Sequence, residues 1–383
     1  MSLDEMAAKA FGISSFTTVG HLLHINLKDH LLQQKHEIGR ALLNKNPRAL
    51  AVVNKINTID NQYRNFEIEV IAKREGCEMT DEELMIVEVN ENKCRFQLDF
   101  SKVYWNSRLC TEHERIIAKL HKPCDIVFDL FAGVGPFSVP AAKAKCQTYA
   151  NDLNPESVAW LGKNIARNKV KTEHIRVFHM DAADFIQKRM KKLLVQEYKR
   201  YEDEELATKP TIHIIMNLPA LAPTFLPHFV GLFKDDTKTT VNSRSLLDTF
   251  RDHSLEHIVY CYCFLKGLFD DPRAELKRIV EEHIGRELND DQFVGAFRVR
   301  NVAPYKDMYR VEIRLDEQIL FDVKSIVGIM RNANGRTSLN GTSKKVTIKT
   351  PPGKRTHDES PDTSGSEASD TKRTKLNDYC SIM

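Results

Sequence analysis

Residues 129–155 read DLFAGVGPFSVPAAKAKCQTYANDLNP, and this stretch decides the fold. The apolar run 125–130 predicts a buried strand that enters a turn containing Gly133 and Gly135. A proline then opens a helix, and a second strand ends at Asp152. A strand, a glycine turn, a helix and an acid-terminated strand in this order form the half-fold that holds an adenosine-bearing cofactor.

The residues around the turn favour S-adenosylmethionine over a dinucleotide. A pyrophosphate needs bare backbone amides at a helix N-terminus, but here Pro136 removes one amide and Phe137 adds bulk. Asp129 would repel a pyrophosphate but suits an ammonium group. Gly133 lets the backbone approach the ligand without a Cβ, and Asp152 can accept hydrogen bonds from both ribose hydroxyls. We expect S-adenosylmethionine; a nicotinamide or flavin dinucleotide and a purely structural turn are the alternatives.

Composition sets wide bounds on function. The chain has 383 residues, of which 42% are hydrophobic and 28% charged, so it can hold two domains and a sizeable core. No apolar run reaches the roughly 18 residues that a membrane span needs, and we expect no membrane association. The eight cysteines form no C-x-x-C pair, so we expect reduced thiols and no metal site. A net charge of +3 neither requires nor excludes nucleic acid.

The pattern of the chain predicts four parts. Residues 1–19 are expected to form a flexible arm, 20–102 a small α+β domain, 103–326 the cofactor-binding domain and 327–383 a disordered tail. The tail is rich in Ser, Thr, Pro, Gly and charged residues, a composition typical of disorder. Its basic clusters at 354–355 and 372–375 could be a bipartite nuclear import signal or ordinary solvated charges.

Strands and helices alternate in the cofactor-binding domain, which predicts a doubly wound, mainly parallel α/β sheet. Seven strands with a closing antiparallel pair are expected of the Rossmann-type class I methyltransferase fold. The strand candidates are 125–130, 147–151, 174–180, 212–216, 257–263, 293–300 and 308–315. Two insertions interrupt the alternation: 186–210 reads as a charged, helical segment and 232–252 as a polar loop.

Three segments outside the glycine turn carry candidate site residues. The segment VYWNSRLCTEHERI, 103–116, could place Arg108, Glu112 and His113 over the cofactor, although its acids could equally serve a helix N-terminus. The segment IIMNLPALAPTF, 214–225, ends a strand in Asn217, whose amide both donates and accepts and so suits a nucleobase edge. An ordinary strand-to-loop turn is the alternative.

Two further features have weaker signals. Asp181 and Ala182 follow the third strand, where an acid can meet the adenine amino group or simply cap a helix. In the closing hairpin, Arg298, Arg300, Lys306, Arg310 and Arg314 alternate with apolar residues and could bind phosphates. A solvated sheet face would show the same alternation.

Taken in order, VYWNSRLCTEHERI, DLFAGVGPFSVP, ANDLNPES, MNLPA and RNVAP closely resemble the eukaryotic and archaeal tRNA (guanine-37-N1)-methyltransferases. The resemblance runs from about residue 21 to residue 315. It implies methyl transfer from S-adenosylmethionine to N1 of the guanine 3′ of the anticodon, with Arg108 as catalytic arginine stabilising O6, Glu112 as general base and Asn217 holding the base. The cofactor set that it implies consists of His113, Asp129, Gly133, Gly135, Asp152, Leu153, Asp181, Ala182 and Asn217.

The resemblance also implies a partner and a location. The anticodon loop of tRNA is the expected partner, with Arg298, Arg300 and Lys306 as substrate contacts, and the protein is expected to be a monomer in the cytoplasm and nucleus, with a possible share in the mitochondrial matrix. Family members usually carry a further N-terminal domain for the outer corner of tRNA, and only about 20 residues precede the resemblance here. The alternatives are a methyltransferase for another RNA base or a protein amide, and a non-catalytic RNA-binding relative.

Overall fold

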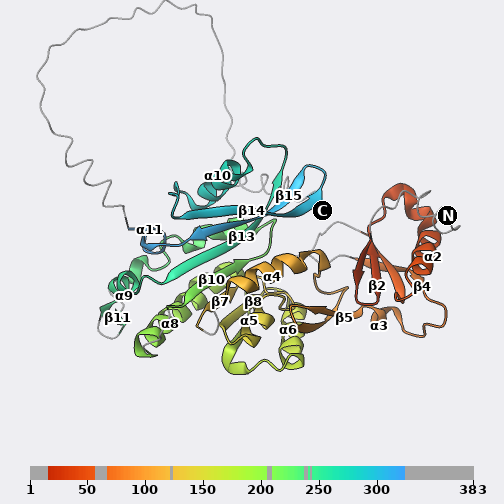
Figure 1. Cartoon of the computed structure of the whole chain (residues 1–383), viewed down its shortest axis with the longest axis horizontal. Helices are drawn as coiled ribbons and strands as arrows, with labels where there is room; N and C mark the ends of the chain where they lie inside the picture. The colour runs from red at the N-terminus through yellow and green to blue at the C-terminus, as the bar shows by residue number, and fades with distance from the viewer. Residues whose placement is uncertain are drawn as a thin grey trace, which may run out of the picture. The chain divides into compact units, whose positions relative to one another are not determined.

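The computed structural model describes residues 16–56, 67–120, 124–204, 209–236, 240–241 and 244–323 (Figure 1). The predicted tail and residues 1–15 of the predicted arm lie outside this part of the chain. The described residues all fall in one compact unit that ends at Val323. Among them, no helix is both long enough and apolar enough to cross a membrane.

A four-stranded sheet opens the described chain, in the order β1-β2-β3-β4. Its strands are β1 (Thr17–Val19), β2 (Leu22–Ile25), β3 (Ala51–Lys55) and β4 (Ile68–Lys73). Between β2 and β3 the chain forms η1 (Asp29–Gln34) and then α2 (Lys35–Lys45), which covers the sheet. Helix α2 buries Ile38, Leu42 and Leu43 against the apolar residues of β2 and β3. The sheet begins at Thr17, three residues before the start predicted for the small domain.

The central sheet has seven strands in the order β14-β15-β13-β10-β7-β8-β9, which confirms the predicted fold class. Five strands are parallel, and β15 runs antiparallel to both β13 and β14. The strands are β7 (Ile126–Asp129), β8 (Gln147–Asp152), β9 (Ile175–His179), β10 (Thr211–Met216), β13 (Glu256–Lys266), β14 (Phe293–Ala303) and β15 (Lys306–Arg314).

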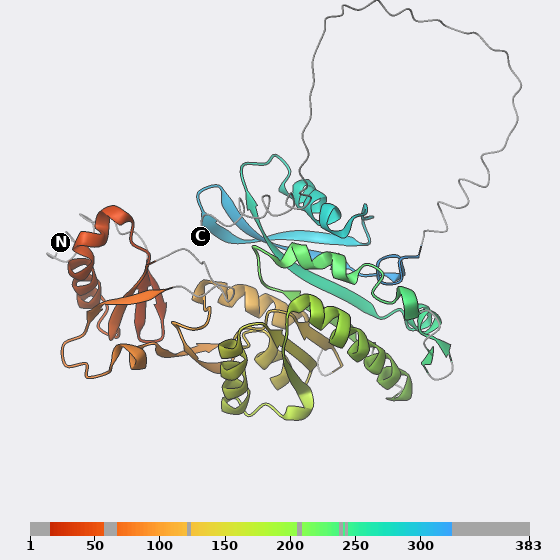
Figure 2. The same cartoon turned by 180° about the vertical axis from the view of Figure 1, so that it is seen from behind.

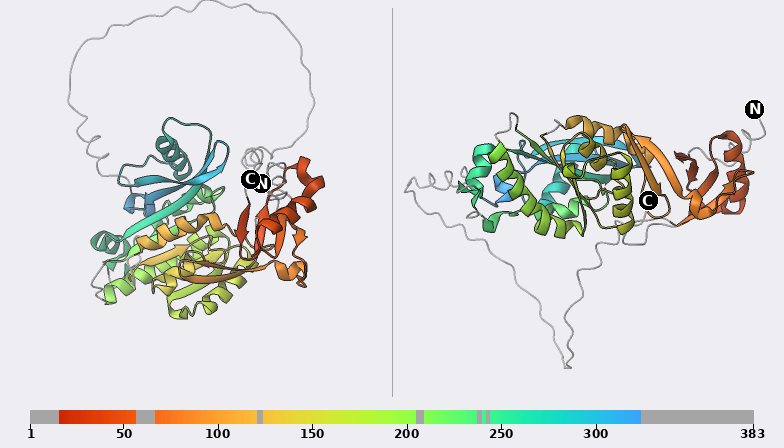
Figure 3. Two further views of the ribbon diagram at one scale, coloured as in Figure 1. Left: turned by 45° about the vertical axis from the view of Figure 1, so that its right-hand side comes forward. Right: turned by 90° about the horizontal axis from the view of Figure 1, so that it is seen from below.

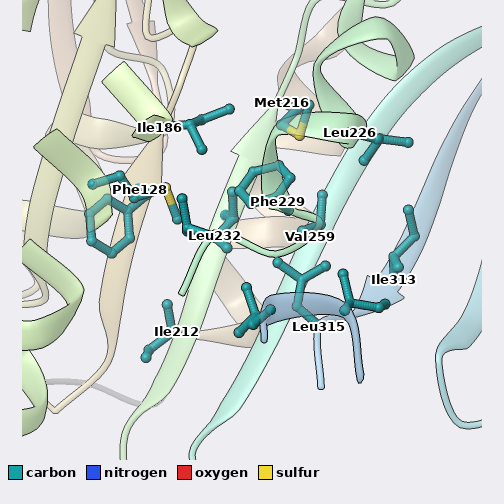
Figure 4. Packing of buried hydrophobic residues seen from close by; sticks show 14 of the residues in the cluster. Phe128, Ile186, Ile212, Met216, Leu226, Phe229, Leu232, Val259, Ile313 and Leu315 are labelled. Atoms are coloured by element: carbon teal, nitrogen blue, oxygen red, sulfur yellow. The ribbon is translucent and has the colours of Figure 1, made fainter. Parts of the chain in front are cut away.

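Both faces of this sheet are buried, because alternate residues of each strand point to opposite sides. One face packs against α4 (Cys110–Lys119) and α5 (Ser138–Lys143) through residues such as Val127, Ile215 and Tyr262. The other face carries Phe128, Met216, Val259 and Ile313 (Figure 4). Helices on both sides of the sheet are visible in Figure 3. The elements of the second face are η4 (Phe185–Met190), α8 (Lys191–Glu204), η5 (Ala222–Phe229), α9 (Leu246–His253), α10 (Pro272–Ile284) and α11 (Glu317–Leu320).

One helical prediction is confirmed and one loop prediction is wrong. The charged segment 186–210 contains helix α8, as expected. The segment 232–252, read as a polar loop, instead contains η6 (Lys234–Asp236), the short pair β11 (Thr240–Val241) and β12 (Arg244–Ser245), and most of α9. Leu246 and Phe250, four residues apart, are buried in the core, so the helical period outweighs the polar composition.

A two-stranded hairpin, β5 (Ile86–Glu91) and β6 (Cys94–Asp99), follows the short α3 (Asp81–Leu84) and joins neither larger sheet. It packs instead against α6 (Pro155–Arg167), seen near the centre of Figure 2. Asn164 of α6 donates to the Gln97 carbonyl at 3.1 Å and accepts from the Gln97 amide at 2.8 Å. Asn168, just after α6, makes the same two bonds to Arg95. The hairpin is thus bound to the cofactor-binding domain, across the boundary that we predicted at residue 102.

Candidate active site

The predicted cofactor residues gather at one edge of the central sheet. Strand β7 lies between β10 and β8, and the chain order reverses at the β7–β10 neighbours, with Ile215 beside Asp129. In open α/β sheets, ligands bind outside the carboxyl ends of the strands at this switch point. Asp129 ends β7, Asp152 ends β8 and Asn217 follows β10, so the three side chains share this edge.

The glycine turn has the conformation that its sequence predicts. Gly133 and Gly135 have φ of +54° and +99°, values that glycine adopts without strain. A Cβ on Gly135 would lie 2.6 Å from Leu161 and Val139, whereas a Cβ on Gly133 would meet nothing within 4 Å. Gly135 is therefore required for packing, and Gly133 leaves open space at the site.

Asp152 links this turn to the next helix. Its Oδ2 accepts from the Gly133 amide at 2.7 Å and its Oδ1 from the Asn154 amide at 2.8 Å. Burial raises the pKa of Asp152, and these backbone donors oppose the rise. A carboxylate has about four acceptor positions, so two remain for ribose hydroxyls.

Asp129 is fully buried beneath the turn. Its Oδ2 accepts from the Ser138 hydroxyl at 2.6 Å, while its Oδ1 has no hydrogen-bond partner among the described residues. Burial raises the pKa of Asp129 to about 7; Asp152 contributes to the rise and Ser138 opposes it. A buried acceptor without a partner is costly, and a cationic ligand at this edge would satisfy it. The observation fits S-adenosylmethionine, which carries an ammonium and a sulfonium, and not a pyrophosphate.

Asn217 has a matching open acceptor. Its Oδ1 is buried and, like Asn151 Oδ1, has no partner within the described part of the chain; Asn217 directly follows the strand next to Asp129. Two amide groups therefore differ in role at this edge, because Asn151 uses its Nδ2 to bind the carbonyls of Leu130 and Met180 and so ties three loops together. Asn217 presents an acceptor to the site, and Asn151 supports its walls.

Arg108 lies on the turn η2 (Ser107–Leu109) that leads into α4. Helix α4 returns the chain to the start of β7, so its N-terminus faces the same carboxyl edge. The Arg108 guanidinium is exposed and, among the residues that the structure describes, has a single hydrogen-bond contact, 3.4 Å to the carbonyl of Phe16. Burial and the nearby charge of Arg108 lower the pKa of Arg300, so the two cations are neighbours.

Glu112 is 3% exposed and faces the sheet. Its Oε1 accepts from the Tyr262 hydroxyl at 2.9 Å and from the Arg310 guanidinium. Tyr262 and Arg310 are paired across β13 and β15, so one cross-strand pair holds one oxygen. Arg310 continues to Glu312 at 2.9 Å, which binds Lys119 at 2.9 Å. The result is a buried chain of alternating charges that fixes α4 to the sheet.

The other carboxylate oxygen of Glu112 is less constrained. Oε2 has a 3.4 Å contact with the exposed Arg115, a distance at which a hydrogen bond is weak. Burial and the Glu112 carboxylate raise the pKa of Tyr262 well above its ordinary value, so Tyr262 stays a donor. The carboxylate therefore has one oxygen fixed and one that a substrate proton could reach.

His113, the neighbour of Glu112, points the other way. Its Nδ1 lies 2.5 Å from Glu91 Oε1 at the tip of the β5–β6 hairpin, and its ring meets the edge of Phe137 at 4.6 Å between centroids. Phe137 belongs to the cofactor turn. His113 thus connects the hairpin, α4 and this turn, a supporting place rather than an open one.

The remaining cofactor candidates lie at the ends of β8 and β9. Asp181 is exposed and its Oδ1 caps the short α7 (Ala182–Asp184), accepting from the Ala183 amide at 2.8 Å. This is the capping role that the sequence left open, and it leaves Oδ2 for a ligand. Ala182 is buried, and the Leu153 carbonyl lies 3.0 Å from His179 Nε2.

The substrate candidates on the hairpin fare differently. Arg298 makes two bonds to Asp307, at 2.8 and 3.0 Å, so its charge is largely used within the hairpin. Arg300 is half-buried, and burial together with the charge of Arg108 lowers its pKa. Lys306 Nζ lies 4.2 Å from the centroid of the Phe264 ring. Of the three, Arg300 is the one that the structure brings toward the predicted catalytic arginine.

Sequence reasoning missed three supporting residues. Ser138 bonds Asp129, Asn151 ties the strand ends, and Asn164 donates to the Val134 carbonyl of the glycine turn at 3.1 Å. The sequence does show Ser138 at the last position of G-x-G-x-x-S, where it could have been read as a partner for the preceding acid. The two asparagines carry no such signal, because their partners are backbone groups remote in sequence.

The sheet order is that of the Rossmann-type class I methyltransferase fold, and the residues at its switch point fit S-adenosylmethionine. Residues 87–239 match the family model of the TRM5/TYW2 methyltransferase domain, and residues 7–76 match that of the TYW2 N-terminal domain. Over this methyltransferase domain, the chain is similar to the TRM5/TYW2 family.

Known relatives agree with this assignment. The chain is 44% identical to a tRNA (guanine(37)-N(1))-methyltransferase of Xenopus tropicalis, covering 85% of the chain and 60% of the relative. The human protein of that name is 40% identical, covering 80% and 54%. The crystal structure of Trm5b from Pyrococcus abyssi superposes with a TM-score of 0.57 at 26% identity, covering 82% of this chain and 79% of that one. The chain thus spans little more than half the length of these two sequence relatives.

Proposed function

We propose that the chain transfers a methyl group from S-adenosylmethionine to N1 of guanine 37 in tRNA. The observation that carries the proposal is the 40–44% identity to proteins named for this reaction, over a stretch that includes every proposed site residue. The open acceptors of Asp129 and Asn217 at one sheet edge support it.

The chemistry asks three things of the protein. Guanine N1 carries a proton and is a poor nucleophile, so a base must take that proton, and the negative charge then spreads onto O6. The target base must also leave its stack to reach the edge of the sheet. S-adenosylmethionine supplies the methyl group from a sulfonium, whose departure needs no metal.

Each task has a candidate residue. Glu112 Oε2 accepts the N1 proton while Tyr262 and Arg310 hold Oε1 in place. Arg108 stabilises the developing charge on O6 with an always charged, planar donor fork. Asn217 Oδ1 accepts from the exocyclic amino group of guanine, which gives its buried oxygen a partner.

Nucleoside analysis tests the proposal. Unfractionated tRNA incubated with methyl-labelled cofactor should yield labelled 1-methylguanosine, and a transcript with adenine at the target position should yield none, because adenine N1 has no proton and its amino group offers Arg108 a donor. Label in another nucleoside or in protein would favour the alternative substrates. No label, with the cofactor bound, would favour a non-catalytic RNA-binding relative.

The monomeric state and the location in cytoplasm, nucleus and mitochondrial matrix stay predictions of the sequence. The basic clusters behind the nuclear prediction lie outside the described residues.

A further inference from the structure

A ledge of residues stands beyond the active edge of the sheet; we define it as residues 266–269 and 302–306. Met216, the last residue of β10, pairs with Cys261, and β13 continues for five residues, to Lys266. At about 3.3 Å per residue, β13 projects roughly 17 Å past the end of β10. Lys266 pairs with Lys306, and the Gly267 amide donates to the Tyr305 carbonyl at 2.8 Å, so the two segments form one surface.

The ledge exposes apolar and aromatic side chains. Leu268 is 83% exposed, Tyr305 65%, Phe269 38% and Val302 36%. Scattered exposed apolar residues are ordinary, but a contiguous group beside a site marks an interaction surface. The proposed mechanism uses none of these four residues.

Tyr305 occupies a backbone position that disfavours it. Its φ is +56°, and it follows Pro304 in the tight turn between β14 and β15. Glycine or asparagine normally takes such a position after proline, and a bulky residue there carries strain. A tyrosine that is both strained and exposed has no structural benefit at this place in the fold.

The ledge is bordered by positive charge. Lys266 and Lys306 are cross-strand neighbours, and burial together with the Lys266 charge lowers the pKa of Lys306. Arg300 lies nearby on β14, next to Arg108 of the proposed site. One acid, the exposed Asp270, directly follows Phe269, while the next acid, Asp271, caps α10, so the cations Lys266, Lys306 and Arg300 outnumber the acid at the ledge. The surface therefore combines exposed rings with cations.

We propose that the ledge binds the unpaired loop of the RNA substrate, with Tyr305 stacking on a base adjacent to the target guanine. Aromatic rings and cations together are the means by which proteins hold single-stranded RNA. A base flipped toward the sheet leaves its neighbours unstacked, and an exposed ring beside the edge can replace the lost stacking. This inference rests on the proposed function, which supplies the RNA.

Binding measurements on a labelled anticodon stem-loop test the inference separately from catalysis. Tyr305→Gly removes the ring and relieves the positive φ, so the variant should be at least as stable as the native chain to urea. It should bind the stem-loop about 5- to 150-fold more weakly, the range expected for one stacked base, while its affinity for S-adenosylmethionine stays unchanged. Tyr305→Phe should restore binding, and Leu32→Ala, an exposed apolar residue of η1, should have no effect.

Abasic substitutions at each nucleotide flanking the target sharpen the test. The loss caused by Tyr305→Gly should disappear when the stacked base is already absent. Equal stem-loop affinity of Tyr305→Gly and the native chain would overturn the inference, as would a self-association of the native chain that the variant loses, since the ledge would then be a dimer surface. Native RNA binding without any methylation would instead refute the proposed function and leave the ledge intact.

Discussion

At the scale of single residues, Glu112 has a structural role in the fold, and the proposed mechanism gives it a catalytic role as well. It is buried within an ion-pair chain, which would suffice to explain its presence as structural. The two oxygens divide the roles, because Oε1 holds Tyr262 and Arg310 while Oε2 has only the long Arg115 contact. Because only one oxygen is held firmly, the proposed mechanism assigns the proton to the other, Oε2.

Glu112→Gln separates the two roles. Glutamine keeps an oxygen that can accept from Tyr262 and Arg310 but has no basic oxygen, so methyl transfer should fall by about 10²–10⁴-fold. Single-turnover rates measure the loss, and calorimetry with S-adenosylmethionine should show native affinity. Glu114→Gln, an exposed acid on the same helix, is the matched control and should behave as native. A native rate for Glu112→Gln would leave Glu112 with its structural role only.

Asp129 should show a trade of stability for binding. Its pKa is about 7 in the fold against an ordinary value of 3.8, so the folded state holds a proton that the unfolded state releases between these values. The buried charge therefore costs stability above pH 7, and the cost disappears below about pH 4. Asp129→Asn should be more stable than the native chain at pH 8, by a few kcal/mol at most, and equal to it near pH 4.

The same substitution should weaken S-adenosylmethionine binding, because an amide offers no charge to the ammonium. Urea titrations at the two pH values and calorimetry at pH 8 measure both effects. A stability difference that is the same at pH 4 and pH 8 would show that packing, not the buried charge, distinguishes the variants.

At this scale the sequence indicated which candidate residues share one edge of the sheet better than which residues hold them there. Asp129, Asp152 and Asn217 follow strand ends that periodicity can place, so their common edge was predictable. Ser138 and Asn164 act on partners that become neighbours only when the chain folds. Arg298 looked like a phosphate contact from its alternation, but Asp307, brought next to it by the hairpin, takes its donors.

At the scale of elements, the β5–β6 hairpin is held to α6 by side-chain amides that imitate a neighbouring strand. Asn164 binds the backbone amide and carbonyl of Gln97, and Asn168, one helical turn later, binds those of Arg95. Gln97 and Arg95 are two residues apart on β6. Four residues along a helix and two along a strand span nearly the same distance, so both side chains can reach β6. Each must donate to a carbonyl and accept from an amide, which an asparagine side chain can do.

The two asparagines should differ in one respect, because Asn164 also bonds Val134 of the glycine turn. Asn164→Ala and Asn168→Ala should each lower the free energy of unfolding, by about 1–3 kcal/mol for each buried group left unpaired. Asn164→Ala should weaken cofactor binding as well, and Asn168→Ala should not. Urea titration and calorimetry on both variants check this, and an equal loss of cofactor affinity in the two would count against a specific role for Asn164.

Helices and strands were predictable where the hydrophobic residues of a segment follow a single clear pattern. The strands of the central sheet are apolar runs between turn signals, and each was found within a few residues of its place. Helix α9 was not predicted because its segment is rich in polar residues. Leu246 and Phe250 lie on the side of α9 that packs against the core, and this is clear only from the folded structure. The packing of the β5–β6 hairpin on α6 was not predicted, since Asn164 lies 67 residues from Gln97.

At the scale of the whole molecule, the question is where one domain ends and the next begins. Composition predicted a boundary at residue 102, but the hairpin before that point packs against α6, and the TRM5/TYW2 methyltransferase match begins at residue 87. The core shared by the hairpin, α6 and the glycine turn includes Phe96, Leu98 and Leu161. The cofactor-binding unit therefore starts at about α3, which Thr80 and Glu83 cap through a reciprocal pair of hydrogen bonds.

Two fragments decide between these boundaries. A chain of residues 79–323 keeps the α3 cap and the hairpin, so it should fold cooperatively and bind S-adenosylmethionine with an affinity close to that of the full chain. A chain of residues 103–323 exposes the apolar side of α6 and leaves Asn164 and Asn168 without partners, so it should unfold at much lower urea concentration and bind the cofactor poorly. Circular dichroism under urea and calorimetry provide both readings. Equal stability and cofactor affinity of the two fragments would support the boundary at residue 102. Such a result would also mean that the glycine turn keeps its conformation when β6 no longer binds Asn164.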